Sequence, residues 1–497
     1  MDSLWLVGSY TDTGDRIRRI KCDEGKPACL KCTSTGRKCD GYQPGPKSTK
    51  RGSPLRSETV SPAQSLTILP SQNPLEIQAL QFFQLYTKFQ ISGYFESELW
   101  NCYVLRLGLV EPSVFHATTA LGSLHRWHIS GNTPSSREAK AFALQQYNKA
   151  ISCLIRPEKP LSRLGTLVTC YMFSGLDALY GNYRSAFQHA ASGISLLSRK
   201  FPVDMEAQQA MISDCGMPSE EKTIEDQLVY HFSRLDILAS TFDSTWVCRT
   251  IDQNLVQIRR FPLRNLEEAN MLLGALTSRI MRFKRLEIEC LEDTTKAAGM
   301  LPPMRDELQR EVEDFSSVFE ELLQASRKLN PQQVSCSKVL KVQLYVGRIM
   351  IFFPEGTAET YYDEFLPLFE SIVSEASHLV SLEPLGHFSN DMGFLPALYL
   401  TGVKCRDSII RNQALALLKS TNRKEGVWES WKLANIVERL IAIEEAGRHG
   451  MDLAESARVS DISVCVGDDE DDHALVNCTR RKWDGNEVEQ IEERIDW

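Results

Sequence analysis

Residues Arg16 to Tyr42 read RIRRIKCDEGKPACLKCTSTGRKCDGY. This stretch combines a high density of Arg and Lys with four cysteines: Cys22, Cys29, Cys32 and Cys39. Closely spaced thiolates suit a tetrahedral zinc site, and zinc binding can supply the folding free energy of a segment too short to build a core. Basic side chains beside them suit a phosphate backbone. The stretch therefore predicts a small zinc-stabilised module that contacts DNA.

The charge of the chain is divided unevenly around this stretch. All 497 residues together carry a formal charge of −9. Residues 16 to 56 contain twelve Lys or Arg against three acidic residues and so carry +9; subtracting +9 from −9 leaves −18 for the rest. Such asymmetry is typical of a basic recognition module attached to an acidic body that does not itself bind nucleic acid.

The remaining composition indicates a soluble protein inside the cell. No apolar run approaches the ~20 residues that a membrane span needs. The opening MDSLWLVGSY lacks the basic start and the small-residue cleavage site of a signal peptide. The other ten cysteines are scattered singly from Cys102 to Cys478. We expect them to be reduced and to serve as small core hydrophobes.

A linker and a long helical body follow the cysteine-rich stretch. Residues 43 to 74 are rich in Pro, Ser, Gly and Lys without apolar periodicity, which predicts a flexible linker. Beyond it, apolar residues recur at helical spacing and strand-like alternation is scarce, so the body over residues 75–450 is predicted to be all-α. Helices are expected at 75–91, 112–129, 144–154, 164–179, 183–197, 224–242, 266–291, 305–329, 339–352, 361–382, 395–418 and 426–448.

Two segments of the body and tail allow more than one interpretation. The stretch Asp306 to Lys328 places apolar residues on one helix face, which serves either core packing or a dimer seam. Residues 451–497 are predicted to form an acidic, partly ordered tail. Within it, Asp468 to Asp472 read DDEDD, a solvated loop that either aids solubility or takes part in an interaction such as activation.

The cysteine spacing C-x6-C-x2-C-x6-C, preceded by RIRRIK, resembles the C-terminal two-thirds of the fungal Zn(II)2Cys6 binuclear cluster. The likeness extends to Lys21 and Asp23 around the first cysteine, to Pro27, and to CDGY at the end. In that family six thiolates hold two zinc ions and a short basic helix enters the major groove. The resemblance implies that Lys21 reads a base edge, with guanine O6 and N7 as suitable acceptors. It also implies phosphate or groove contacts for three arginines: Arg16, Arg18 and Arg19.

The chain departs from the family pattern at its first two ligands, one of which bridges both metals. The family's cysteines would fall at positions 12 and 15, where this sequence has Asp12 and Asp15. Carboxylate is a harder ligand than thiolate and does not normally replace a bridging sulfur. Three accounts remain open. Residues 1–15 are not the natural start, or the regulator has lost metal-dependent DNA binding, or Asp12, Asp15 and the four thiolates still hold metal, for instance a single ion on the cysteines.

The helical body also resembles a known family, the fungal-specific transcription factor regulatory domain. The stretches that carry this likeness are FFQLYTKFQISGYFESELWN (82–101), HATTALGSLH (116–125), QQYNKAI (145–151) and SRLDILASTF (233–242). The resemblance implies an all-α fold that restrains activity or responds to effectors. Two polar pairs in the body are interpreted as structural: His125 with His128 as a packed or exposed pair, and Arg234 with Asp236 as partners in buried ion pairs with other helices.

No phosphate-binding glycine loop, nucleophile elbow or zinc-protease motif occurs, so an enzyme is not expected. We predict a nuclear, sequence-specific, DNA-binding regulator of RNA polymerase II genes, in a metabolic or secondary-metabolite pathway. Its predicted partners are double-stranded DNA, the transcription machinery and a second copy of the chain. The alternative is a helical protein-interaction or effector-binding module without metal-dependent DNA binding. The target element, the effector and the direction of regulation are not determined by the sequence.

Overall fold

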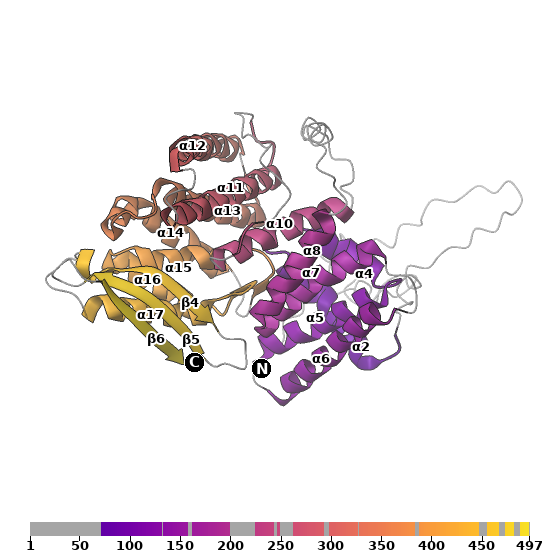
Figure 1. Ribbon diagram of the computed structural model, residues 1–497. Coiled ribbons are helices and arrows are strands. Elements are labelled where there is room, and N and C mark those ends of the chain that lie inside the picture. Colours follow the sequence, from indigo (N-terminus) through magenta and orange to yellow (C-terminus); the bar gives the residue numbers. More distant parts are fainter. Residues whose placement is uncertain are drawn as a thin grey trace, which may run out of the picture. The chain divides into compact units, whose positions relative to one another are not determined.

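A computed structural model describes residues 71–131, 133–157, 162–198, 224–242, 246–248, 262–292, 298–326, 328–382, 387–446, 455–466, 473–481 and 488–496. The chain divides into two units, Met1–Thr67 and Ile68–Trp497. All the described residues belong to the second unit, which is mainly helical as predicted (Figure 1).

The first part of the described body is a set of packed helices. They are α2 (Pro74–Phe82), η3 (Phe83–Thr87), α3 (Lys88–Ile91), η4 (Leu99–Tyr103), α4 (Val104–Leu107), α5 (Pro112–Ser130), α6 (Pro134–Ile155), α7 (Arg163–Tyr180) and α8 (Tyr183–Ser198). Proline opens α2, α5 and α6, since its fixed φ suits the first turn and its missing N–H is not needed there. Gly181 ends α7 in the left-handed conformation (φ 100°), so α8 turns back along α7.

The second part of the body adds α10 (Ile224–Phe242), α11 (Leu266–Glu292), η7 (Ala298–Met300), α12 (Leu301–Ala325), α13 (Pro331–Phe352), η8 (Glu359–Phe365), α14 (Leu366–Leu382), α15 (Leu395–Lys404), α16 (Ser408–Ser420) and α17 (Ser430–Ala446). The apolar stripe of α12 points into the core: Leu308, Val312, Phe315 and Phe319 are all buried. The core-packing interpretation of this stripe is therefore confirmed.

Several expected helix boundaries differ in the structure: α6 begins at Pro134 and not at residue 144, α13 begins at Pro331 and not at residue 339, and α12 spans Leu301–Ala325 and not 305–329. The predicted helix 395–418 is broken between α15 and α16, where the Asp407 carboxylate accepts hydrogen bonds from the N–H groups of Ile409 and Ile410 and so starts a new helix. The last predicted helix begins at Ser430 and not at Gly426. Residues before it form the hairpin β2 (Lys424–Glu425) and β3 (Trp428–Glu429), whose first strand pairs with β1 (Phe388–Ser389).

A three-stranded antiparallel sheet near the C terminus was not predicted. Its strands are β4 (Val459–Val466), β5 (His473–Arg481) and β6 (Val488–Asp496), with β5 in the middle. Strands β4 and β6 contact α17 (Figure 1), and the β5 side chains Ala474, Val476 and Cys478 are buried. The pairing register of β4 shifts between Ser460 and Ser463. The acidic stretch 468–472 lies outside the described residues.

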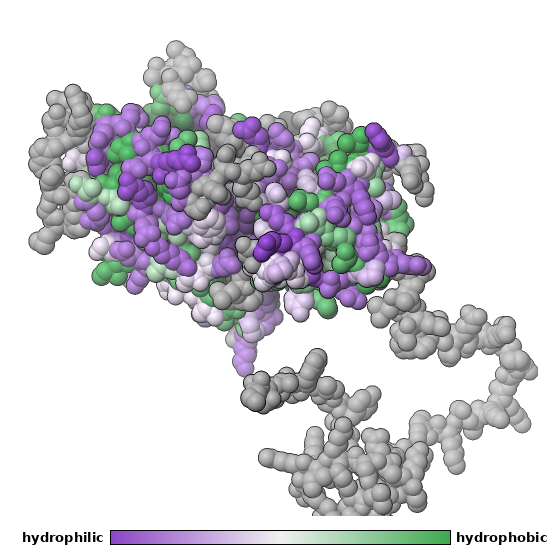
Figure 2. Space-filling view, turned by 90° about the horizontal axis from the view of Figure 1, so that it is seen from below, coloured by the Kyte–Doolittle hydropathy of each residue, from purple (hydrophilic) through white to green (hydrophobic). Residues whose placement is uncertain are grey.

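The surface of the body is mixed in character. On the face shown in Figure 2, hydrophobic residues are interspersed with hydrophilic ones. None of the helices in the described ranges is long and apolar enough to cross a membrane.

Candidate functional site

All of the sequence-predicted site residues lie before residue 71, outside the described part of the chain. The set comprises the ligand candidates Cys22, Cys29, Cys32, Cys39, Asp12 and Asp15 and the DNA-contact candidates Arg16, Arg18, Arg19 and Lys21. Their arrangement stays a prediction. The chemistry of the donor set can still be tested: four thiolates suffice for one tetrahedral zinc ion, whereas a binuclear cluster needs two further ligands or bridges.

In the described body, no group of three or more His, Cys, Asp or Glu is placed to hold a metal ion. The described cysteines are free, and most of them are buried. Burial raises the pKa of the Cys170 thiol to about 11 and that of Cys336 to about 12, so both remain protonated and unreactive at neutral pH. Cys170 and Cys336 therefore pack as small hydrophobes, as expected, whereas Cys465 is exposed.

The histidine pair on α5 is part of the packing. The His125 ring is fully buried, with Nδ1 2.9 Å from Thr87 Oγ1 and Nε2 3.0 Å from Gln90 Oε1. Burial, together with the nearby ring of His128, lowers the pKa of His125 to about 3, so the ring is neutral at physiological pH. The same Gln90 oxygen also accepts the N–H of Phe388 at 3.3 Å. His125 thus helps to join α2–α3 to β1.

A second polar junction holds the start of α15. The Glu425 carboxylate, fully buried, accepts hydrogen bonds from the backbone N–H groups of residues 393, 394 and 395, each at 3.0 Å. Arg423 Nε lies 2.6 Å from the same carboxylate. Arg234 Nε is 2.8 Å from Asp391 Oδ1, which confirms the ion pair predicted for Arg234, although its partner lies between β1 and α15 and not on a helix. Asp236 Oδ1 accepts the indole N–H of Trp246 at 2.8 Å. Because these polar groups are buried and hydrogen-bonded to one another, we assign them a structural role at the start of α15.

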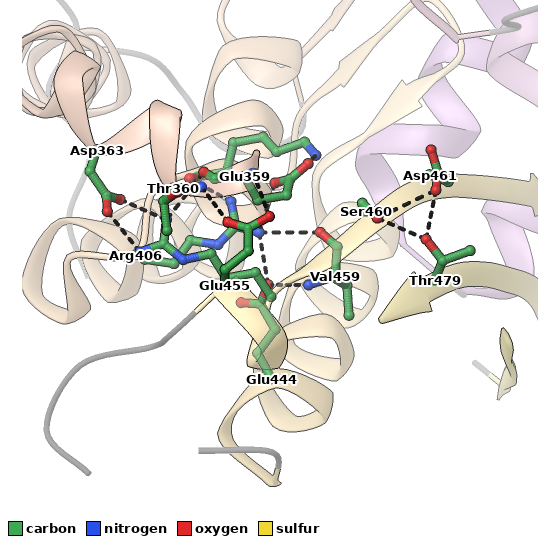
Figure 3. A network of polar contacts seen from close by, with 12 residues as sticks. Glu359, Thr360, Asp363, Arg406, Glu444, Glu455, Val459, Ser460, Asp461 and Thr479 are labelled. Atoms are coloured by element: carbon green, nitrogen blue, oxygen red, sulfur yellow. Dashed lines mark hydrogen bonds and ion pairs between the residues drawn. The ribbon is translucent and has the colours of Figure 1, made fainter. Parts of the chain in front are cut away.

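A buried ionic network fastens the C-terminal sheet to the helices (Figure 3). The Glu444 carboxylate of α17, fully buried, lies 2.8 Å from Arg406 Nη2 and 2.6 Å from Arg411 Nη2, and it accepts the N–H of Val459 in β4 at 2.9 Å. Burial alone would raise the pKa of Glu444, but the two guanidinium groups outweigh it and hold the pKa below its ordinary value. Glu444 is therefore ionised and unavailable for acid–base chemistry.

Further pairs extend this network to η8. Arg406 Nη2 also lies 3.0 Å from Glu359 Oε2. The backbone N–H of Glu359 donates to a Glu455 carboxylate oxygen at 2.9 Å, and that of Thr360 to the other at 2.8 Å. Arg458 binds both oxygens of Asp363, at 2.8 and 2.7 Å. Sequence analysis missed this network, although Ile462 and Val464 alternate with polar residues and signal the strand β4 that it anchors.

A cleft of about 730 Å³ lies beside α11. Apolar and charged side chains both line it, from the segment 246–248, from α11 and α12, and from the end of α13; among them are Trp246, Phe283, Met304, Met350 and Glu355. The lining charges include ion pairs such as Lys284 with Glu355, whose Nζ and Oε1 lie 2.7 Å apart. Its volume falls within the range of small-molecule sites. No feature of the sequence pointed to it.

Comparison with known proteins gives a family match for the segment that precedes the helical body in sequence. Residues 16–49 match the family model of the fungal Zn(2)-Cys(6) binuclear cluster domain, which begins at the residue where the family pattern was recognised. Members of that family bind two zinc ions. This match, at the head of a helical body, defines the class of protein that the chain resembles: the fungal zinc-cluster transcription regulators, which are not enzymes.

The relatives are transcription regulators as well. The aspercryptin biosynthesis cluster-specific transcription regulator atnN of Emericella nidulans is 25% identical over 528 aligned positions, which cover 84% of this chain and 84% of the relative. The transcription regulator lscL of Purpureocillium lilacinum is 32% identical over 203 positions, covering 37% of this chain and 47% of the relative. The transcriptional regulatory protein moc3 of Schizosaccharomyces pombe is 48% identical over 60 positions, 12% of this chain and 11% of the relative. No solved structure matches the chain.

Proposed function

We propose that this chain is a sequence-specific DNA-binding regulator of RNA polymerase II genes in the nucleus, acting on the gene cluster of a secondary-metabolite pathway. The observation that carries the proposal is the cysteine-rich basic segment at residues 16–49, which matches the zinc-cluster domain. The printed name of the relative that aligns over most of the chain, a biosynthesis cluster-specific regulator, supports the pathway assignment.

In this proposal the chain is divided as the sequence suggests: a recognition segment at 16–42, a linker at 43–74, a regulatory body at 75–450 and a tail at 451–497. Cys22, Cys29, Cys32 and Cys39 hold zinc and fix the basic helix that precedes them. Lys21 donates to a base edge in the major groove, and the neighbouring arginines neutralise phosphates. The acidic body does not contact DNA; it regulates the segment that does and engages the transcription machinery.

The test is a gel-shift titration of the full chain with zinc and duplex DNA selected from a random library. Three forms are compared: the chain as it stands, Asp12→Cys/Asp15→Cys, and Asp12→Ser/Asp15→Ser. The last form removes the same carboxylates without adding thiolates. We expect the two-cysteine form to bind selected DNA tightly and the two-serine form to bind it no better than the unchanged chain. If neither the unchanged chain nor the two-cysteine form binds DNA above the non-specific level, the proposed function is refuted.

The salt dependence of DNA binding is a second test of the basic segment. If the basic segment contacts six or more phosphates, affinity should fall by a factor of ~10³ or more between about 50 and 200 mM salt, because each contact releases condensed counterions. An affinity that does not change with salt would contradict phosphate contacts by this segment.

The second candidate function is an effector-binding module without metal-dependent DNA contact. Two observations favour it: Asp12 and Asp15 stand where the family has cysteines, and the body carries the cleft of about 730 Å³. Its test is titration with the apolar fluorophore anilinonaphthalene sulfonate. Val247→Arg, at a half-exposed cleft residue, should remove one binding site, whereas Val488→Arg, at a similarly exposed residue away from the cleft, should not. Equal binding by all forms would exclude the cleft as a site.

A further inference from the structure

The cleft beside α11 combines buried and accessible side chains. Phe283 and Leu308, which both line it, are almost fully buried, whereas Val247 in the same lining is 50% exposed. Its volume of about 730 Å³ suits a drug-sized molecule, most of whose surface such a cleft encloses. The chemistry of the lining therefore indicates which class of small molecule fits.

The charged side chains of the lining pair with one another. Three basic residues of α11 each lie close to an acidic residue that also lines the cleft: Lys284 Nζ is 2.7 Å from Glu355 Oε1, Arg285 Nε is 3.1 Å from Glu289 Oε1, and Arg279 Nη2 is 3.6 Å from Glu307 Oε1. Arg282, the fourth basic residue of the lining, is engaged as well. A charged ligand would have to compete with these pairs for a counter-charge, whereas an uncharged ligand leaves every pair intact.

Uncharged polar groups of the lining are also bonded within the protein. The Trp246 indole N–H donates to Asp236 at 2.8 Å, and Ser240 Oγ donates to the carbonyl of Ile237 at 2.7 Å. Burial raises the pKa of the Cys248 thiol to about 11, so the thiol is protonated, and it donates to the carbonyl of Asp236 at 3.8 Å. Apolar contact and shape would therefore hold a ligand here more than hydrogen bonds to these groups.

Methionine is concentrated in the lining. Met281 of α11, Met304 of α12 and Met350 of α13 are three of the twelve methionines in the chain, and the rings of Trp246 and Phe283 lie in the same lining. Thioether sulfur makes favourable contacts with aromatic rings, and the unbranched Met side chain adapts to the shape of what it packs against. A lining of sulfur atoms and rings thus favours an aromatic ligand over an aliphatic one.

We propose that this cleft binds an uncharged aromatic small molecule. The inference rests on the second candidate function, a body that binds an effector, and it names the chemical class that the site accepts. It does not depend on DNA binding by residues 16–49, so the two can fail separately.

The experiment compares two fluorophores that share the same rings. N-phenyl-1-naphthylamine is uncharged, and anilinonaphthalene sulfonate adds a sulfonate anion to that ring system. Each is titrated into the full chain, unchanged and with Val247→Arg, and the site that this substitution removes is assigned to the cleft. We expect the uncharged fluorophore to bind that site more tightly by about tenfold or more. Equal or tighter binding of the sulfonate there would overturn the proposal, whereas the effector function itself fails if Val247→Arg removes no site for either fluorophore.

A charge variant tests the reason for this preference. Glu355→Gln removes a lining carboxylate, while Lys284 keeps Glu287, whose Oε2 lies 2.9 Å from its Nζ. The added positive charge should tighten binding of the sulfonate by about threefold and leave that of the uncharged fluorophore unchanged. Glu370→Gln, at an exposed residue of α14 outside the lining, is the matched control and should change neither affinity. Identical affinities in these two glutamine variants would contradict the argument from paired charges.

A sulfur variant tests the preference for rings. Met304→Leu nearly keeps the volume of the side chain but removes the thioether, so the affinity for the uncharged fluorophore should fall by about two- to tenfold. Met271→Leu, at a 45% exposed residue of α11 outside the lining, should have no effect. If both leucine variants bind the fluorophore like the unchanged chain, sulfur does not contribute and the assignment to aromatic ligands is wrong.

Discussion

The Glu444 network offers a quantitative test of how the C-terminal sheet is held. The substitution Glu444→Gln keeps the size of the side chain and one oxygen that can accept the Val459 N–H, but it removes the negative charge. Arg406 keeps its partner Glu359 at 3.0 Å. Arg411 keeps the hydrogen bond from its Nε to the carbonyl of Gly402 and loses the carboxylate, which lies 2.6 Å from its Nη2.

The expected loss in the free energy of unfolding follows from the partners that each arginine keeps or loses. Breaking one side of a buried ion pair typically costs 3–5 kcal/mol, and because one of the two arginines retains a carboxylate we expect a loss of about 3 kcal/mol in the free energy of unfolding. That is a large part of the roughly 5–15 kcal/mol that stabilises a typical domain. The measurement is urea denaturation of the full chain followed by helical circular dichroism, with the urea dependence compared between variants.

Glu438→Gln on the same helix is the matched control. Its carboxylate lies 2.7 Å from Lys419 Nζ, but both side chains are about half exposed, so the pair should contribute less than about 1 kcal/mol. Hydrogen exchange adds a local readout, since loss of Glu444 should lower the protection of β4 more than that of α5. A stability of Glu444→Gln within about 1 kcal/mol of the unchanged chain, or equal to that of Glu438→Gln, would refute this reasoning.

Two further predictions concern the core. Burial lowers the pKa of His125 and of His231 to about 3, so each ring is neutral in the folded protein at physiological pH. Below pH 6.5 each ring takes up a proton when the protein unfolds, so the free energy of unfolding is highest above that pH and falls as the pH drops. The expected loss is about 1 kcal/mol per ring between pH 7 and about 5.5. Urea denaturation across that range measures the slope, His231→Asn should flatten it by one proton, and an unchanged slope would contradict a neutral buried ring. A Cβ on Gly193 would overlap the buried ring of Phe232, so Gly193→Ala should destabilise the body by about 1–3 kcal/mol, whereas Gly299→Ala, which faces open space, should not. Equal melting temperatures for these two variants would contradict that packing.

Local signals in the sequence predicted most of the helices. Pro112 opens α5, Gly181 ends α7, and the apolar spacing of α12 faces the core, because these effects act within a few residues along the chain. The strands near the C terminus were missed because a strand, unlike a helix, acquires its hydrogen bonds only from its neighbours in the sheet, and those neighbours are not read from local spacing. The broken helix at 405–407 was missed because apolar residues continue on both sides of it.

The candidate sites divide in the same way. The zinc-type segment is recognisable from sequence alone, because its cysteines and basic residues lie within a few positions of one another in the chain. The partners of the buried charges cannot be recognised from the sequence, because they lie far away along the chain: Arg234 pairs with a residue 157 positions away, and Arg406 with one 38 positions away. Which apolar face of the first helix is buried and which is exposed likewise depends on where distant segments pack. The sequence by itself thus indicated the class of the protein, and only the tertiary structure decided its ionic network and its cleft, because those arise from contacts between residues far apart in the chain.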